Sequence, residues 1–142
     1  MTEGIDDTLL TNLGRVLLRD IPDAVVYADR DGLIRFWNEG AARIFGFPPD
    51  EALGRSLDII IPERLQRRHW DGYRHMMRTG RSRHRADELL SVPALTRSGE
   101  TISIQFTVAP VAGDDERIAG IVAVLRDVTA TFQELKRLRR GR

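Results

Sequence analysis

AVVYADRDGLIRFWN, residues 24–38, predicts two β-strands joined by a tight turn. The run Ala24-Val25-Val26-Tyr27-Ala28 is apolar, and Leu33-Ile34-Arg35-Phe36-Trp37 follows with a similar composition. The dipeptide Asp31-Gly32 between them is a strong hairpin signal, because glycine accepts the positive φ angle that such turns need. We therefore expect an antiparallel strand pair early in the chain.

Helices and three further strands account for the rest of the chain. Before the hairpin, apolar residues recur every three or four positions behind Asp6, Asp7 and Thr8, which predicts an amphipathic helix ended by Pro22. The other predicted elements are helix 39–45 capped by Asn38, a short helical turn over 48–54, a helix from about Glu63 to Arg78, strands at 89–95, 102–111 and 118–128, and a last helix that carries Phe132, Leu135 and Leu138.

Strands joined by tight turns favour an antiparallel sheet, here of five strands in an α+β fold. Residues 102–108 alternate between apolar and polar side chains, whereas residues 121–125 are a continuous apolar run. Such a run is expected of a central strand that is covered on both faces. We expect the inserted helices to cover one face, and the N-terminal helix or a second subunit to cover the other.

Composition narrows the classes of function. A chain of 142 residues fits one domain, and a net charge of +1 argues against a surface built wholly for nucleic acid. The chain has no cysteine, which removes disulfides, thiolate catalysis and zinc–thiolate sites. It has no membrane-length apolar run and no visible nucleophile with a base partner, so we expect a cytoplasmic protein that is not an enzyme.

His69 lies on the apolar arc of the helix predicted from Glu63 to Arg78. At about 100° per residue, Tyr73 and Met76 share its side of that helix, and most of the arginines lie opposite. A buried imidazole is either hydrogen-bonded in the core or holds a metal or cofactor. The residues alone leave both interpretations open.

The order of elements and several motifs together resemble the PAS family of sensor domains. The motifs are Ile21-Pro22-Asp23-Ala24, Asp31-Gly32 with Phe36-Trp37-Asn38, Ala41-Ala42 with Ile44-Phe45-Gly46, Glu51-Ala52-Leu53-Gly54, Ile61-Pro62-Glu63, Arg97-Ser98-Gly99 and Arg126-Asp127-Val128-Thr129. The resemblance implies a sheet in the order 2-1-5-4-3 with helices on one face around a ligand pocket. It also implies a sensor domain over residues 21–129, between an N-terminal helix at 1–20 and a signalling helix at 130–142. Asp127 and Thr129 match the family's signal-transmitting triplet.

Within that family the chain is similar to the haem-binding, oxygen-sensing type found in some histidine kinases. That resemblance implies that His69, seven residues after Pro62, is the axial ligand of a haem b iron. The oxygen-sensing members hold the gas with an arginine on the following strand, but the matching position here falls near Leu89 or Leu90. Arg83 or Arg85 can pair with haem propionates. The absence of cysteine excludes the adduct chemistry of flavin-binding, light-sensing members.

A pocket between the sheet and the long helix is the site that the resemblance implies. The residues expected to line it are His69, Tyr73, Met76, Leu65, Leu89, Leu90, Ile104, Val122 and Val124. Its occupant is haem b, another small ligand or nothing. If nothing binds there, His69 is a core residue and the domain is a cofactor-free dimerisation or interaction adaptor.

The first and last helices carry apolar stripes without an obvious partner inside one small domain, which predicts a parallel homodimer through both. The signal then passes to another signalling protein, such as a transcription regulator, or to an output domain outside this chain. Nucleic-acid binding through the arginines of residues 63–85 and the basic C-terminus is a further alternative, although a charge run is usually a solvated helix face.

Overall fold

The computed structural model describes residues 4–81 and 90–141. The elements, in chain order, are α1 (Asp7–Arg19), β1 (Ala24–Asp29), β2 (Ile34–Trp37), α2 (Glu39–Phe45), α3 (Pro49–Ala52), the 3₁₀ helix η1 (Leu57–Ile60), α4 (Glu63–Thr79), β3 (Leu90–Leu95), β4 (Thr101–Ala112), β5 (Ile118–Asp127) and α5 (Thr129–Arg140). All of the helices and strands expected from the sequence are present, and η1 was not predicted.

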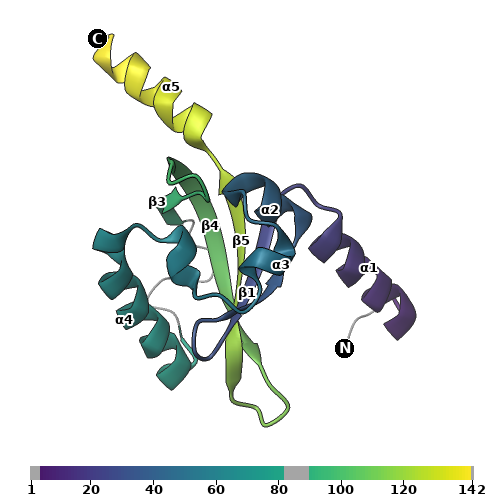
Figure 1. Ribbon diagram of the computed structural model, residues 1–142. Coiled ribbons are helices and arrows are strands. Elements are labelled where there is room, and N and C mark those ends of the chain that lie inside the picture. The colour runs from purple at the N-terminus through teal and green to yellow at the C-terminus, as the bar shows by residue number, and fades with distance from the viewer. Residues whose placement is uncertain (1–3, 82–89, 142) are drawn as a thin grey trace.

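The strands form one antiparallel sheet in the order β2-β1-β5-β4-β3, which confirms the expected topology. β1 and β5 lie side by side near the centre, with Ala24 opposite Leu125 and Asp29 opposite Gly120. The beginning of β1 and the end of β5 therefore meet at the same end of the sheet. For this reason α1 and α5 both leave the sheet from that end (Figure 1).

Helices α2, α3 and α4 lie on one face of the sheet, and the main core fills the space beneath them (Figure 1). Trp37 is at the centre of this core, with its ring centroid 5.5 Å from that of Phe45 and 6.3 Å from that of Phe47. Its Nε1 donates a hydrogen bond to the carbonyl oxygen of Phe47 at 2.8 Å. The indole thus packs against α2 and also satisfies its own polar atom.

Asn38 joins the beginning of β1 to the beginning of α2. Its side-chain oxygen accepts hydrogen bonds from the backbone N–H groups of Val25, at 2.8 Å, and of Ala41, at 2.9 Å. Its side-chain nitrogen donates to the carbonyl oxygen of Asp23 at 3.0 Å. Gly40 lies against the same carbonyl, where an added Cβ would be 2.2 Å from the oxygen. One buried side chain therefore caps a helix and holds two residues of a neighbouring segment.

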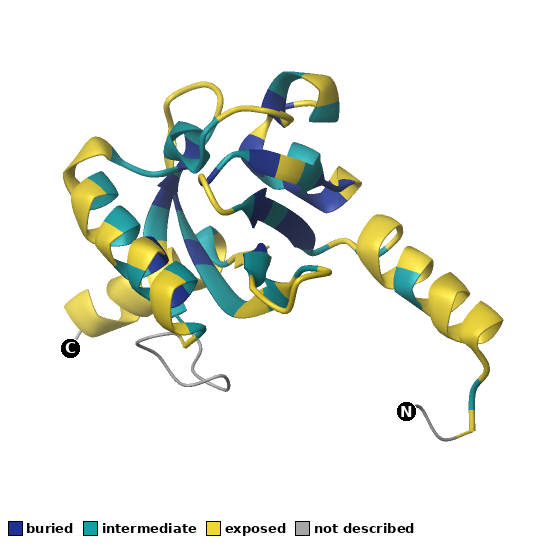
Figure 2. Cartoon of the chain, turned by 90° about the horizontal axis from the view of Figure 1, so that it is seen from below, coloured by how far each residue is buried: buried dark blue, intermediate teal, exposed yellow. Residues whose placement is uncertain are grey.

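The opposite face of the sheet, which we call the outer face, has no described helix over it (Figure 2). α1 has no buried residue and extends away from the sheet, so the expectation that it covers this face of its own chain is wrong. Val124 of the outer face is 43% exposed as a result. The apolar residues of α5 are also exposed.

Replacing Asn38 with alanine tests this junction. We expect Asn38→Ala to lower the free energy of unfolding by about 2 to 4 kcal/mol, because it removes a helix cap and leaves buried backbone groups unpaired. Chemical denaturation measures the change. Asn12→Ala, on exposed α1, is the matched control and should stay within about 0.5 kcal/mol of the wild type. An equal effect of the two substitutions would contradict the role given to Asn38.

Candidate ligand-binding site

Helix α4 carries the candidate site and is fastened to the sheet by two aromatic side chains. The Tyr73 hydroxyl donates a hydrogen bond to the carbonyl oxygen of Asp29, at the end of β1. Trp70 donates from Nε1 to the carboxylate of Asp58 in η1, at 2.7 Å. These bonds hold the inner face of α4 against the β1–β2 turn and η1.

Gly32 in the β1–β2 turn makes this close approach possible. It has a φ angle of 77°, and a Cβ at this position would lie 2.1 Å from the ring of Trp70. Glycine is therefore needed both for the turn and for the contact with α4. The sequence pattern indicates only the turn, because Trp70 lies far from Gly32 along the chain.

His69 lies beside these two aromatic residues, one turn of helix from Tyr73. Its ring centroid is 4.5 Å from that of Trp70 and 5.8 Å from that of Tyr73. Its Nδ1 atom is buried and has no hydrogen-bond partner among the described residues. The side chain therefore points inward, as the helical arc predicts, but its buried nitrogen is not paired as a core histidine's would be.

Burial keeps the His69 imidazole neutral. It lowers the pKa of His69 from 6.5 to about 4, although the negative charge of Asp58 acts in the opposite direction. A neutral imidazole has a free lone pair and is the form that binds a metal ion. At neutral pH, His69 is therefore chemically ready to act as a ligand.

Several predicted pocket residues lie on the helix-covered side of the sheet, but they do not form one cluster. Tyr73 and Met76 are buried in a cluster with Ala28 and Ile121. Ile104 is buried in the main core, and Leu65 and Leu90 are half-buried. Leu89 lies outside the described residues, as do Arg83 and Arg85.

Val122 and Val124 are not on this side, so their assignment to the pocket is wrong. Ile121, Ala123 and Leu125 of β5 pack into the two cores beneath the helices. Because side chains alternate along a strand, Val122 and Val124 point to the outer face. Every residue in the run 121–125 is apolar, so the pattern gave no sign of which residues point inward.

The side chains around His69 suit a cofactor that needs one protein ligand. No group of three or more histidine, aspartate or glutamate side chains gathers as a metal site within residues 4–81 and 90–141. A bare metal ion usually needs three or four protein ligands, whereas a haem iron, already held by its porphyrin, can be bound through one histidine. An unpaired, neutral, inward-pointing imidazole beside apolar and aromatic groups fits haem. Two open surface hollows lie elsewhere, and α4 lines neither of them. One is lined by Asp29–Asp31, Asp115 and Arg117–Ala119, and the other by Arg43–Gly46, Thr96–Ser98 and Glu100.

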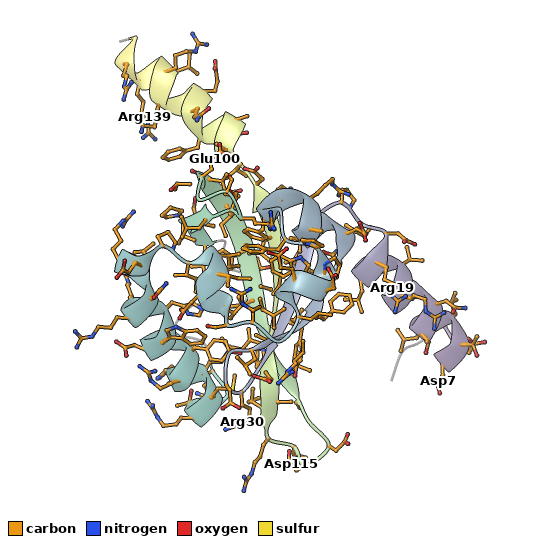
Figure 3. All side chains as sticks on the ribbon, viewed as in Figure 1. Asp7, Arg19, Arg30, Glu100, Asp115 and Arg139 are labelled. Carbon is orange, nitrogen blue, oxygen red and sulfur yellow. The ribbon has the colours of Figure 1, made fainter. Side chains whose placement is uncertain are left out.

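The junction between β5 and α5 is also held by side chains. The Asp127 carboxylate accepts hydrogen bonds from both the backbone N–H, at 2.9 Å, and the hydroxyl of Thr129. The same hydroxyl oxygen accepts from the backbone N–H of Ser103 in β4, at 3.0 Å. The start of α5 is therefore tied to the sheet, whereas the far end of that helix, at Arg139, stands clear of it (Figure 3).

Residues 18–132 match the family described as the PAS fold. The sensor protein FixL of Bradyrhizobium diazoefficiens is 32% identical over 137 residues, which are 96% of this chain and 26% of that protein. An uncharacterized protein of Azorhizobium caulinodans is 30% identical over 127 residues, which are 89% of this chain and 17% of that protein. The chain thus spans about a quarter or less of the length of these relatives.

Solved structures share the fold. The PAS domain of a protein from Colwellia psychrerythraea has a TM-score of 0.73 and 18% identity, over 86% of this chain and 98% of that one. An RNA-binding light-oxygen-voltage receptor has a TM-score of 0.74 and 19% identity, over 98% of this chain and 40% of that one. At such identities the likeness establishes the fold alone. No helix in the described part of the chain is long and apolar enough to cross a membrane.

The lowered pKa of His69 predicts a pH dependence of stability. Between about pH 6.5 and 4 the unfolded chain binds a proton that the folded chain does not, so stability is full above pH 6.5 and falls as the pH is lowered. We expect His69 to account for a loss of about 2 to 3 kcal/mol between pH 7 and pH 4.5. Denaturation at both pH values, comparing wild type with His69→Gln, isolates this contribution. His75→Gln is the control and should keep the wild-type difference; its loss there too would contradict the assignment.

Proposed function

The chain belongs to the PAS family and is a PAS sensory domain, and from this premise we propose that it binds haem b through His69 and signals through α5. The observation that carries the proposal is a neutral His69 on the inner side of α4, whose buried Nδ1 has no hydrogen-bond partner within residues 4–81 and 90–141. The similarity to the sensor protein FixL supports it. On this proposal the domain is a gas or redox sensor with no enzymatic activity of its own.

Haem would supply an iron that can take a gas molecule or change its redox state. The residues of this chain would hold and orient the histidine that binds it. The bonds from Trp70 to Asp58 and from Tyr73 to Asp29 hold α4, and with it His69, in one orientation. Burial raises the pKa of the Tyr73 phenol, which keeps that hydroxyl protonated and able to donate.

The response would leave the site through the central strands. A shift of α4 moves the carbonyl of Asp29 at the end of β1, and β1 is paired with β5 along its whole length. β5 ends at the Asp127–Thr129 junction, where α5 begins. A ligand drives such a shift only as far as its affinity differs between the two positions of α4.

The domain would work as a homodimer that passes its signal on. The exposed apolar side chains of α1 and α5 supply contact surface, and Phe132, Leu135 and Leu138 of α5 are each 45 to 53% exposed. A neighbouring signalling protein or an output domain would receive the movement of α5. The same exposed stripes favour the second candidate function, a cofactor-free dimerisation adaptor in which His69 has only a structural role.

An absorption spectrum tests the haem proposal. Protein purified from cells supplied with a haem precursor should show a Soret band at about 400 nm. The band should be lost in His69→Ala and kept in His75→Ala, a histidine of the same helix, while circular dichroism shows that both variants are folded. A colourless wild-type protein would contradict haem binding and favour the cofactor-free adaptor, whereas a band unchanged in His69→Ala would show that another residue holds the haem.

The proposed route through α5 predicts a specific role for the Thr129 hydroxyl. We expect Thr129→Ala to speed hydrogen exchange in the first turn of α5 and to cost about 1 kcal/mol, because Asp127 and the Ser103 N–H each lose a partner. Thr129→Ser keeps the hydroxyl and should behave like the wild type. Equal exchange rates in the alanine and serine variants would show that the hydroxyl does not hold α5 to the sheet.

A further inference from the structure

Helix α4 presents a basic surface on the side that faces away from the sheet and from His69. At about 100° per residue, five arginines fall within an arc of about 120°, and all five are exposed. We call this surface the arginine stripe, and its members are Arg64, Arg67, Arg68, Arg74 and Arg78. The helix lies at the edge of the molecule, and side chains that end in nitrogen point outward from it (Figure 3).

Most of the positive charge of the stripe is not neutralised. Arg74 pairs with Asp71 at 2.8 Å, in an ion pair whose two side chains are each more than half exposed. The other four arginines make no ion pair with any residue of the described ranges 4–81 and 90–141. Glu63 is the second acidic residue of the helix. The whole chain has a net charge of only +1, so positive charge is concentrated on α4.

The stripe weakens the helix that carries it. Arg64 lies in the first turn of α4, where the helix dipole disfavours positive charge. Arg67 and Arg68 follow it at three and four positions, so the three side chains are neighbours on the helix surface and repel one another. Folding of the domain gains nothing from this repulsion. A bound polyanion would relieve it, whereas water alone only screens it.

The chemistry of the stripe favours a phosphate backbone as its partner. None of the exposed large apolar residues in the described part of the chain belongs to α4. Protein partners usually dock through buried aromatic or aliphatic side chains, and a helix that binds a membrane surface inserts an apolar side. Guanidinium groups without such anchors suit phosphate oxygens, with which they form charge-assisted hydrogen bonds.

The dimensions of α4 suit double-stranded DNA. The helix rises about 21 Å from Arg64 to Arg78, and a helix with its side chains is about 10 to 12 Å wide. The major groove of B-form DNA is about 12 Å wide and admits a helix, whereas the major groove of double-stranded RNA is too narrow. Each DNA strand has a phosphate about every 3.4 Å along the axis, so every free arginine of the stripe has phosphates in reach.

We propose that the arginine stripe of α4 binds the phosphate backbone of double-stranded DNA. The four arginines without an acidic partner supply the contacts. The proposal does not depend on haem, because His69 lies on the inner side of the same helix and takes no part in it. One helix then carries both the DNA-binding surface and the candidate ligand site.

Fluorescence anisotropy of a labelled DNA duplex of about 20 base pairs tests the proposal. For four phosphate contacts, the logarithm of the binding constant should fall with the logarithm of the salt concentration with a slope of about −3.6. Affinity should then drop about 100-fold between about 50 and 200 mM salt. Arg67→Gln/Arg78→Gln should weaken binding at least about tenfold at the lower salt concentration and reduce the slope to about −2.

The matched control is Arg139→Gln/Arg140→Gln, which removes the same charge from the exposed basic helix α5. It should bind the duplex within about twofold of the wild type, and circular dichroism should show that both double variants are folded. Equal losses in the two variants would show that net charge, not the stripe, attracts DNA, and would overturn the proposal. So would a wild-type protein that does not bind the duplex at about 50 mM salt and about 100 μM protein.

Two further probes test the choice of partner. One is an RNA duplex of the same length, and the other is a vesicle of phosphatidylserine and phosphatidylcholine in equal amounts. We expect both to bind the wild type more weakly than DNA does. Tighter binding to either probe that is lost in Arg67→Gln/Arg78→Gln would assign the stripe to RNA or to lipid headgroups, and would overturn its assignment to DNA.

Discussion

The attachment of residues 22–25 to α2 determines how the rest of the molecule is arranged. Asn38 pairs with the backbone of Asp23, Val25 and Ala41, and the bare backbone of Gly40 lets α2 approach that segment. Three buried or partly buried backbone groups meet at one place, and each would cost free energy if it were left without a partner. Their pairing fixes α2 on one face of the sheet at the point where β1 begins.

The two ends of the central strands hold different sets of contacts. At the beginning of β1 and the end of β5, the Asp23–Arg126 ion pair links the strands that carry the terminal helices. The ion pair itself is exposed and adds little stability. At the other end of β1, Tyr73 and Trp70 fasten α4 and place His69 beside the sheet. β1 and β5 therefore connect the candidate ligand site with the helix that would carry its signal.

Local sequence patterns predicted the secondary structure correctly wherever a residue type has one strong conformational preference. The Asp31-Gly32 turn, the cap at Asn38 and the alternation in residues 102–108 each predicted an element that the structure contains. The helical arc of α4 placed Tyr73 and Met76 inward correctly. It could not find Asp58, because the hydrogen bond to Trp70 joins residues on different elements. The pattern of β5 gave the wrong side of the sheet for Val122 and Val124, because β5 is apolar on both of its faces.

The sequence by itself determined every helix and strand except η1, the strand order through its family motifs, and the inward direction of His69. These follow from short-range preferences: glycine in turns, capping side chains, and the spacing of apolar residues along a helix or strand. Only the tertiary structure decided which face of β5 meets the helices, that the buried nitrogen of His69 has no partner among the described residues, and that α1 extends away from its own sheet. Those properties depend on contacts between segments far apart in the chain, and a pattern read along one segment contains no information about what packs against it.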